Sequence, residues 1–469
     1  MTAAHFEILQ GECNVGGVWE GACQLLCGVS SLDEDPWGQN PVRAPELRLT
    51  LHRPEPLPPS RVRVGELSVS WDMDCYISLL RKAREEGLQP GVCHSHPYSG
   101  APFSHQDDEN EGHLRDLLRR RNRDDSQVLV SLLFRGEKSV DARVWGAAGP
   151  PQPARVRIVG PEVVDASTSV SEHGGSANPD FLQRQTLAVG VETVERLQKL
   201  RIGVVGCGGT GSAVIELLAR AGVGRLFLVD PDVVTATNLN RLYGSTRSDV
   251  KEGRPKVHVL KDHVERMGLG TQIAIRQGKL ADAATVKLLR TCDFIFGCTD
   301  DHLGRLLLNR LAYFYLIPVI DTGLSVDPSA PGKPARVSGR VTVLRPGTTC
   351  LLCRGVVSPR RAREQGLRYK QPGEYNRQVK EGYITEDNTP TPVVGTFTTE
   401  TATAAINEFL AAVAGLRGTK GWASERTIRY DLDRCRPTGC PPNESCSVCG
   451  VPDSWGIGDI QPFLDLGGF

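Results

Sequence analysis

The stretch RIGVVGCGGTGSAVIELLARAGVGRLFLVD, from Arg201 to Asp230, predicts the fold of the larger part of the chain. A short apolar run leads into glycines, a helical pattern follows, and a second apolar run closes the stretch, which predicts strand, turn, helix and strand. Gly206, Gly208 and Gly211 fit the spacing G-x-G-x-x-G, with Gly209 between them. Such glycines let the backbone approach phosphates, and the helix start supplies amides and a positive dipole end. The stretch therefore predicts a nucleotide-binding βαβ unit.

The same alternation of apolar runs and helical patterns continues along the chain. RLFLVD, KVHVLKDHVERM, DFIFGC, LLLNRLAYFYL and PVIDTG follow one another, and FLAAVAGLRG predicts the end of one more helix. Alternation of this kind predicts βαβ units and a mainly parallel sheet. We therefore expect an α/β, Rossmann-like domain over residues 179–469.

The polar residues after these runs separate two kinds of nucleotide enzyme. With the glycines alone, an NAD-dependent enzyme is an alternative, because an acid at the position of Asp230 can bind ribose hydroxyls. A hydride-transfer site has no need for cations and further carboxylates, whereas splitting ATP needs cations for the triphosphate and a carboxylate for Mg²⁺. The chain supplies such groups at Asp232, Asn238, Arg241, Lys256 and Asp300.

This set resembles the ubiquitin-activating-enzyme family, which includes the ThiF and MoeB adenylyltransferases, over about residues 180–450. The motifs D-x-D-x5-N-x-x-R, G-x-P-K and C-T-D are all present. The resemblance implies that ATP and Mg²⁺ bind here. It implies ribose binding by Asp230, phosphate binding by Asn238, Arg241 and Lys256, and Mg²⁺ coordination by Asp300.

The segment FLQRQTLAVG resembles the short helix that, in this family, sends an arginine into the ATP site of a partner subunit. The matching residue is Arg184, and the resemblance implies a homodimer. A surface helix charge is the alternative interpretation of Arg184.

A second constellation lies in VCHSHPYSGAPFSHQDDE, which begins at Val92. On a strand, His94 and His96 point to the same face, and Asp107 at a following helix start can complete three ligands. Three N/O ligands leave a position open for water, as in a catalytic zinc site, and zinc lowers the pKa of that water. Ser104 can then hydrogen-bond an oxyanion. The alternative is a polar loop with incidental histidines.

The string resembles the signature of the JAB/MPN (JAMM) metalloproteases, which cut ubiquitin-like proteins from their targets, over about residues 5–145. The resemblance places His94, His96 and Asp107 on the zinc ligands and Ser104 on the oxyanion serine. It also implies a glutamate as general base, for which WEGACQLLCG offers Glu20. Glu46 and Glu66 are alternatives.

Two C-x-x-C pairs, Cys350 with Cys353 and Cys446 with Cys449, predict a second metal site. Four thiolates without an open position are typical of a structural zinc. A redox pair is the alternative for either pair alone. Cys435 and Cys440 are close enough in sequence to replace a ligand or to remain free thiols.

Residues 354–434 contain no cysteine, although many activating enzymes carry a catalytic cysteine in this region. The chain therefore either only adenylates or passes its acyl group elsewhere. A partner's nucleophile can attack the adenylate, Cys435 or Cys440 can serve, or Thr385, Thr389 or Thr391 can form an oxyester. A threonine hydroxyl is a poor nucleophile unless a base activates it.

Composition sets the organisation and excludes some partners. The chain has 469 residues, with 55 Lys and Arg against 55 Asp and Glu, which gives no support for binding nucleic acid. No apolar run reaches the length of a membrane span. Fourteen cysteines without a predicted signal peptide indicate a reducing, cytoplasmic location. We expect an α+β JAB/MPN domain at 1–148, a Gly-, Pro- and Ser-rich flexible linker at 149–178, and the adenylation domain at 179–469.

Together the two resemblances predict adenylation of the C-terminal carboxylate of a ubiquitin-like protein and zinc-dependent cleavage after the same tail. A conjugating-type enzyme is the expected partner, as in bacterial conjugation systems, including those used in antiphage defence. The first alternative is activation of a ubiquitin-like sulfur carrier for thiocarboxylate-based biosynthesis. The second is an NAD-binding Rossmann protein with a zinc-binding accessory domain.

Overall fold

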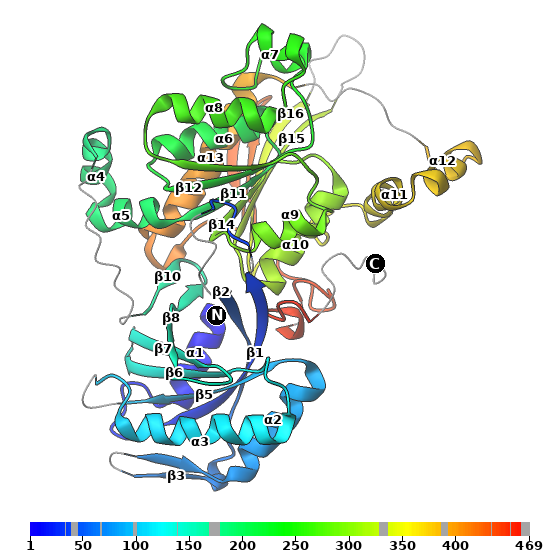
Figure 1. Cartoon of the computed structure of the whole chain (residues 1–469). Coiled ribbons are helices and arrows are strands. Elements are labelled where there is room, and N and C mark those ends of the chain that lie inside the picture. The colour runs from blue at the N-terminus through cyan, green and yellow to red at the C-terminus, as the bar shows by residue number, and fades with distance from the viewer. Residues whose placement is uncertain are drawn as a thin grey trace.

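The computed structural model describes residues 1–32, 34–38, 46–65, 68–96, 101–137, 139–167, 179–327, 336–385, 393–432, 434–450 and 452–460. Two domains are stacked on each other, with the N-terminal domain below the C-terminal domain in Figure 1. A six-stranded sheet forms the centre of the lower domain, and an eight-stranded sheet forms the centre of the upper domain.

In its described residues, the N-terminal domain contains the α-helices and strands α1 (Ala3–Glu12), β1 (Ala22–Leu32), β2 (Glu46–Glu55), β3 (Val62–Val64), β4 (Val69–Trp71), α2 (Met73–Glu86), β5 (Gln89–Ser95), α3 (His105–Asn122), β6 (Leu129–Gly136), β7 (Ser139–Trp145), β8 (Gln152–Ala154), β9 (Arg157–Val159) and β10 (Val163–Asp165). Its sheet has the order β2-β1-β5-β6-β7-β8, in which only β5 and β6 are parallel. Successive residues of β1 point to opposite faces. Leu25 therefore packs in the core beside α1, while Leu26 packs with α2 and α3.

The C-terminal domain contains the remaining elements: α4 (Gln183–Val189), α5 (Val191–Lys199), β11 (Arg201–Val205), α6 (Gly209–Arg220), β12 (Arg225–Val229), α7 (Arg247–Glu252), α8 (Lys256–Met267), β13 (Gln272–Arg276), α9 (Ala283–Leu289), β14 (Phe294–Gly297), α10 (His302–Phe314), β15 (Val319–Asp327), β16 (Arg336–Leu344), α11 (Pro359–Lys370), α12 (Pro372–Lys380), α13 (Gly395–Ala414), β17 (Glu425–Arg429) and β18 (Arg434–Pro437). The strand and the helix expected before and after Gly206 are β11 and α6. Across the part of the chain that the structure describes, no helix has the length and apolar character needed to cross a membrane.

The upper sheet has the order β13-β12-β11-β14-β15-β16-β17-β18. Its first five strands are parallel, and β16 to β18 continue it in antiparallel pairing. This arrangement confirms the mainly parallel α/β sheet that the alternating pattern predicts. Side chains alternate between two cores: Val204 packs with α6 and α13, and Val205 packs with α9 and α10 on the opposite face.

Part of the stretch expected to be a linker forms strands. β8 pairs with β7 at the edge of the N-terminal sheet, and β9 pairs with β10. The Pro- and Gly-rich composition of 149–167 gave no strand signal. These short strands form because β8 pairs with β7 and β9 pairs with β10. Residues 168–178 of the expected linker lie outside the described residues.

A C-terminal strap, defined here as residues 452–460, lies between the two domains. The Thr50 hydroxyl donates to the Gly456 carbonyl over 2.6 Å, and the Asp459 amide donates to the Val29 carbonyl over 3.0 Å. On its other side the Gly458 amide donates to the carbonyl of Phe314 in α10 over 3.0 Å. The strap thus contacts β1 and β2 of the lower domain and a helix of the upper domain at once.

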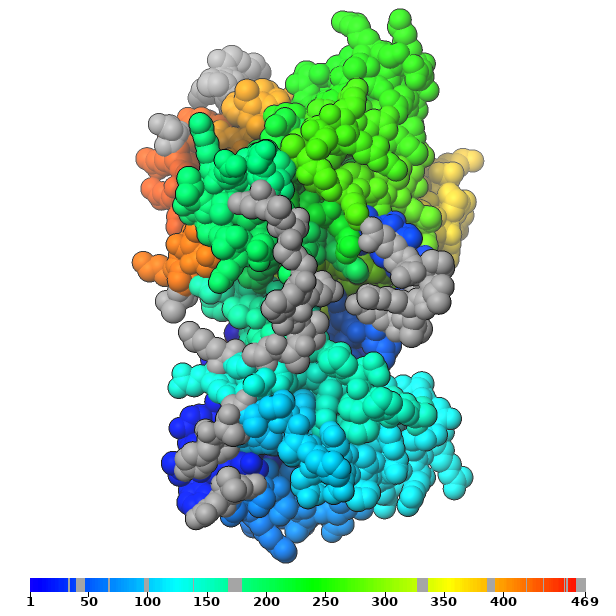
Figure 2. Space-filling model, turned by 60° about the vertical axis from the view of Figure 1, so that its left-hand side comes forward, coloured from blue at the N-terminus to red at the C-terminus, as the bar shows by residue number. Residues whose placement is uncertain are grey.

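Other contacts across the interface reach the amino-terminal ends of the upper strands. The Trp37 indole donates to the Leu226 carbonyl over 3.2 Å, and Arg157 pairs with Asp293 over 2.5 Å. Figure 2 shows blue N-terminal residues lying against the green surface of the upper domain. The lower domain is therefore attached to the edge of the parallel sheet at which its strands begin.

The strap depends on glycine at 458, where φ is +63° and an added Cβ would lie 2.6 Å from the Val29 carbonyl oxygen. We expect Gly458→Ala to lower the free energy of unfolding by about 2 kcal/mol more than Gly268→Ala, because only the first adds a clash. Gly268 is a matched control: its φ is +65°, and no atom of the described residues lies within 4 Å of an added Cβ. Denaturant unfolding of both variants measures the difference, and equal losses would show that the strap is not tightly packed.

Candidate functional site

Three neighbouring strands of the upper sheet end in one row, and each is followed by residues that the sequence marks as functional. The pairs Val205–Val229 and Val205–Gly297 are in register across β12, β11 and β14. Asp230 follows β12 directly, Gly206 follows β11, and Asp300 lies three residues after β14. In open parallel sheets, ligands bind at the carboxyl ends of the strands.

The glycines of the loop have different structural roles. Gly206 has φ of +94°, and an added Cβ would lie 2.5 Å from the carbonyl oxygen of Cys298. A Cβ on Gly211 would lie 1.9 Å from the carbonyl oxygen of Gly206, so this glycine allows α6 to approach the loop. A Cβ on Gly208, in contrast, would meet no atom of the described residues within 4 Å. The space beside Gly208 at the start of α6 is therefore open to a ligand.

Asp230 is buried at the end of β12. Its carboxylate accepts hydrogen bonds from the amides of Cys207, over 2.6 Å, and Asp232, over 2.9 Å. Burial raises the pKa of Asp230, although Lys256 and the two amides favour its charged form. The side chain thus ties the glycine loop to the end of β12 and lies where the sequence predicts contact with a ribose.

Lys256 is the first residue of α8 and is almost fully buried. Its ammonium lies 2.8 Å from Asp232 Oδ2 and 3.8 Å from Asp230 Oδ1. The predicted phosphate-binding lysine and two predicted acids are therefore together at the edge of the sheet.

Arg241 also lies beside the glycine loop, because a Cβ added to Gly209 would be 2.9 Å from Arg241 Cδ. Its guanidinium donates to Asn240 Oδ1 over 2.9 Å and to the carbonyl of Thr237. Asn238 uses its side-chain oxygen to accept from the amide and hydroxyl of Thr235, each over 3.0 Å, which leaves its NH₂ group for a ligand.

The remaining predicted residues of this half are exposed. Asp300 is exposed after β14, next to Asp301, whose side chain caps the start of α10. Arg184 is exposed on α4, the short helix seen apart from the sheet in Figure 1. The carboxyl edge thus combines open glycine backbone, a helix start, two cationic side chains and three acidic side chains. This set is suited to a nucleoside triphosphate and a divalent cation.

The structure also brings together His94, His96 and Asp107 at the end of β5 and the start of α3, with ligand atoms within 4.8 Å of one another. His94 Nε2 lies 3.1 Å from Asp107 Oδ1, and His96 Nε2 lies 3.6 Å from Oδ2. Tetrahedral zinc with bonds of about 2.1 Å holds its ligand atoms about 3.4 Å apart. Within the described residues, His94 Nε2 is buried, and its contact with Asp107 lacks hydrogen-bond geometry, as expected of a nitrogen that binds a metal. The three side chains fit a zinc ion.

Ser104 and Asp107 hold each other at the start of α3. Asp107 Oδ2 accepts from the Ser104 amide and hydroxyl, each over 2.7 Å, and Ser104 caps the helix as a capping box. Burial opposes the charged form of Asp107, but the nearby His94 and the two Ser104 donors hold its pKa well below the usual range. The carboxylate is therefore kept ionised beside the two histidines.

The strand register favours Glu20 over Glu46 as the general base. Ala22 pairs with His94, and the Ser95 amide donates to the Gly21 carbonyl over 3.2 Å, so Glu20 lies alongside His96. Glu46 pairs with Leu32 at the other end of β1, about 34 Å along the strand from Ala22. Glu66 lies outside the described residues.

Two residues at this site were missed in the sequence analysis. The Arg143 guanidinium lies 3.8 Å from the centre of the Phe103 ring, and that ring lies 6.1 Å from the His94 ring. Arg143 also pairs with Asp108 over 2.5 Å and with Glu111 over 2.8 Å. Arg143 comes from β7, and nothing local in the sequence links that strand to the histidines.

Cys350, Cys353, Cys446 and Cys449 form a second cluster, with all four sulfurs within 4.8 Å of one another. Cys350 Sγ lies 3.8 Å from Cys446 Sγ, and Cys353 Sγ lies 3.7 Å from Cys449 Sγ. Zinc–sulfur bonds of about 2.3 Å in a tetrahedron separate the sulfurs by about 3.8 Å. The cluster therefore fits a four-cysteine zinc site.

The other candidate nucleophiles are not members of this cluster, although the Cys440 carbonyl accepts from Thr349, next to Cys350. Cys435 and Cys440 are exposed thiols on and after β18. Thr385 is exposed after α12, whereas Thr389 and Thr391 lie outside the described residues.

Comparison with known proteins gives matches to the C-terminal domain. The ThiF family model matches residues 182–448. Molybdopterin-synthase adenylyltransferase of Escherichia coli (strain K12) is 28% identical over 262 residues, which cover 55% of this chain and 89% of the relative. Ubiquitin-like modifier-activating enzyme 5 of Oryza sativa subsp. japonica is 28% identical over 45% of this chain and 49% of the relative. Adenylyltransferase and sulfurtransferase MOCS3 of Danio rerio is 28% identical over 42% of each chain.

The matches differ in how much of each relative they cover. The chain spans about half the length of the Oryza relative and less of the Danio relative. Residues 1–181, with the histidine site, lie outside the family match.

Zinc content tests the two metal clusters separately. We expect about two zinc ions per chain in the wild type and about one in each of His96→Ala and Cys446→Ser, since each variant removes one ligand. Elemental analysis of the purified chain gives the number, with Cys440→Ser as a control that keeps the wild-type content. A wild-type content of one that His96→Ala leaves unchanged would refute the histidine site.

The loop glycines offer a second test, because binding and packing roles fall on different residues. We expect Gly208→Ala to change the free energy of unfolding by less than about 0.5 kcal/mol but to weaken ATP binding at least about tenfold, because its methyl group would enter the ligand space. Gly211→Ala is expected to cost at least about 2 kcal/mol of stability through its clash with Gly206. Denaturant unfolding and ATP titration measure the two effects. Unimpaired ATP binding by Gly208→Ala would contradict the assignment of that space.

Proposed function

Because the chain belongs to the ThiF family, we propose that its adenylyltransferase activity is directed at the C-terminal carboxylate of a ubiquitin-like protein. The observation that carries the proposal is the convergence of Asp230, Arg241 and Lys256 on an open glycine loop at the carboxyl edge of the sheet. The names of the Escherichia coli and Oryza relatives support both the reaction and this class of substrate.

The chemistry assigns a task to each side chain. The carboxylate of the protein substrate attacks the α-phosphorus of ATP, the bond to the β-phosphate oxygen breaks, and pyrophosphate leaves. Lys256 and Arg241 stabilise charge on the phosphates, and Asp230 orients the ribose. Mg²⁺ would be held by the exposed Asp300 and would share the phosphate charge.

A second candidate fate of the adenylate is sulfur transfer. The Danio relative is named as an adenylyltransferase and sulfurtransferase, and a Thermus thermophilus relative is named as a sulfur carrier protein adenylyltransferase. The two functions share the adenylation step and differ in what consumes the adenylate. A conjugating-type enzyme supplies a nucleophile in the first, and a sulfide donor supplies one in the second.

For the N-terminal domain we propose a JAB/MPN zinc peptidase that cuts after the tail of the same ubiquitin-like protein. The fit of His94, His96 and Asp107 to zinc supports this proposal, together with the position of Glu20 beside His96. Zinc would supply an activated water at neutral pH. Glu20 would take the proton of that water, and Ser104 would stabilise the oxyanion.

The two proposed sites lie at opposite ends of the molecule. β1 runs about 27 Å from Ala22, beside His94, to Ser30 at the domain interface. β11 runs about 13 Å further, from Arg201 near Trp37 to Val205 before the glycine loop. One bound tail cannot occupy both sites of a chain at once, so the processed tail would leave the peptidase site before it is activated. A homodimer in which Arg184 reaches the partner's nucleotide site completes the proposal.

Adenylation is tested by exchange of labelled pyrophosphate into ATP, with a panel of mature ubiquitin-like and sulfur-carrier proteins as substrates. We expect exchange with at least one of them, reduced at least about 100-fold in Lys256→Ala and Asp300→Asn because phosphate charge is no longer stabilised. A carrier extended past its mature end should support exchange only when His96 is intact, because its carboxylate is exposed only by cleavage.

Two outcomes would contradict these expectations. Full exchange by Lys256→Ala would refute the adenylation site. Equal exchange of the extended carrier by the wild type and by His96→Ala would refute processing, while exchange of the mature carrier shows that each preparation is active.

A further inference from the structure

The segment from Arg254 to Lys256 places the Lys256 ammonium at the carboxyl edge of the upper sheet. Few backbone hydrogen bonds hold this segment. The Val234 amide donates to the Arg254 carbonyl over 2.9 Å, the Arg254 amide donates to the Asp249 carbonyl over 3.0 Å, and the Lys256 amide donates to the Asp232 carbonyl over 3.0 Å. Between these bonds, Val233 and Pro255 form an isolated bridge. Pro255 has no N–H to donate, and so short an antiparallel pair is marginal alone. Side chains must therefore contribute to holding Lys256 in place.

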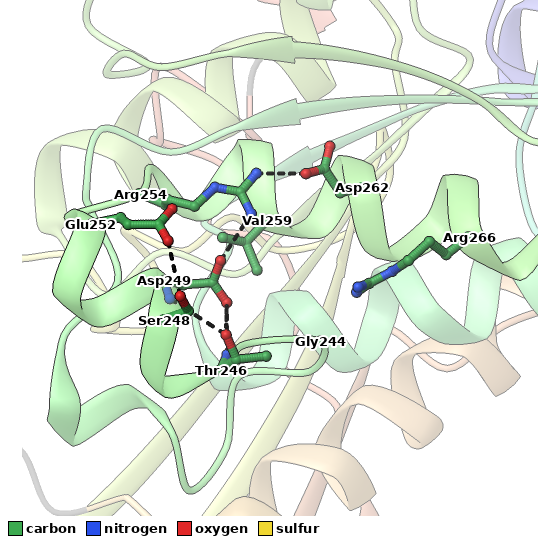
Figure 3. A pocket seen from close by; sticks show the side chains of 9 residues that line it. All are labelled: Gly244, Thr246, Ser248, Asp249, Glu252, Arg254, Val259, Asp262 and Arg266. Carbon is green, nitrogen blue, oxygen red and sulfur yellow. Dashed lines mark hydrogen bonds and ion pairs between the residues drawn. The ribbon is translucent and has the colours of Figure 1, made fainter.

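The Arg254 side chain supplies two such contacts, which Figure 3 shows from close by. Its Nη1 donates to Asp249 Oδ1 over 2.9 Å, and its Nη2 donates to Asp262 Oδ2 over 2.5 Å. Asp249 belongs to α7 and Asp262 to α8. Arg254 thus joins the two helices on either side of the segment that ends at Lys256.

Asp249 is itself a fixed anchor. Its other oxygen accepts from the amide and the hydroxyl of Thr246, each over 2.7 Å, at the start of α7. Burial opposes ionisation of Asp249, but the Thr246 donors and Arg254 hold its pKa below the usual range. The carboxylate is therefore charged and correctly oriented when it binds Arg254, and the bond is charge-assisted.

A cavity of about 230 Å³ borders these ion pairs, and Arg254 and Arg266 both line it. The space leaves that side of Arg254 open rather than packed against neighbouring side chains. Loss of the guanidinium would leave the segment with its backbone bonds and without the two side-chain bonds that join it to α7 and α8. Lys256 would then keep its ion pair with Asp232 but lose the support that fixes the backbone before it.

We propose that Arg254 is a positioning residue for ATP binding: it holds Lys256 at the phosphate position through Asp249 and Asp262. The proposal deepens the proposed function, because it rests on the assignment of Lys256 to the ATP phosphates. Arg254 touches none of the glycines of the loop in this scheme and acts only through Lys256.

The test is a double-mutant cycle measured with Mg·ATP alone, titrated into the full chain by calorimetry. We expect Arg254→Gln to weaken ATP binding about five- to tenfold, because two charge-assisted bonds are lost. In a Lys256→Ala background the same change should weaken binding less than about twofold, since the residue through which it acts is gone. Arg254→Lys keeps the positive charge but cannot donate to both carboxylates in the geometry of a guanidinium. Its ATP affinity should therefore lie between that of the wild type and that of Arg254→Gln.

Matched variants separate positioning from general damage. Arg266→Gln removes a cation from the same cavity and should leave ATP affinity unchanged. Asp262→Asn breaks one of the two bonds at a half-exposed site, and it should weaken ATP binding less than Arg254→Gln does. It replaces Arg254→Gln in the cycle if that variant does not fold.

Three results would overturn the proposal. Equal weakening by Arg254→Gln with and without Lys256 would show that Arg254 acts on the whole domain and not through Lys256. Unchanged affinity in Arg254→Gln, alongside loss in Lys256→Ala, would overturn the positioning role and leave the proposed function intact. Unchanged affinity in Lys256→Ala itself would overturn both, because ATP would then not depend on this lysine.

Discussion

In-register pairing of the parallel strands β12, β11 and β14 is the constraint on which the candidate nucleotide site at the carboxyl edge of the upper sheet depends. Val229, Val205 and Gly297 lie in one row across the sheet. The chain therefore leaves all three strands at the same level of the carboxyl edge, at Asp230, at the glycine loop and at the segment that leads to Asp300. A slip of one residue in any strand would turn its side chains to the opposite face. The same row continues to Asp321 on β15, which is fully buried and pairs with Arg340 over 2.6 Å. Breaking such a pair leaves a buried charge uncompensated, so the row is costly to disturb.

The lower domain depends on a comparable constraint at its own sheet. Antiparallel pairing of β1 with β5 places the chain before Ala22 beside His94, and it places the far end of β1 at the domain interface. The strap fills that interface and begins soon after Cys449. The four-cysteine cluster, the strap and β1 therefore follow one another through space. Through them the end of the upper domain that carries the four-cysteine cluster is joined to the lower domain.

The sequence was sufficient for features that are local along the chain. The glycine loop, the strands around it and each C-x-x-C motif have spacings that a single turn or helix imposes. The structure confirms the parallel α/β sheet, and it brings together the four cysteines and the three side chains at His94. The strap, β8 to β10 and the Arg143–Phe103 contact were not predictable in this way. Thr50 and Gly456 are 406 positions apart, and no periodicity or motif connects residues at that separation.

Arg254 illustrates the same limit within a motif. The sequence shows it between Gly253 and Pro255, where the pattern marks only glycine, proline and lysine. Its two carboxylate partners become visible only when α7 and α8 are placed in space. Residues that position a functional side chain depend on tertiary contacts, and a motif reports only the side chain that is positioned.

The most direct measurement is a crystal structure of the full chain with a non-hydrolysable ATP analogue and Mg²⁺. The analogue should lie at the carboxyl edge of the parallel sheet, with its phosphates beside Gly208 and Lys256 and its ribose at Asp230. Nucleotide bound elsewhere, with the space beside Gly208 still open, would contradict the placement of the adenylation site at this row of strand ends.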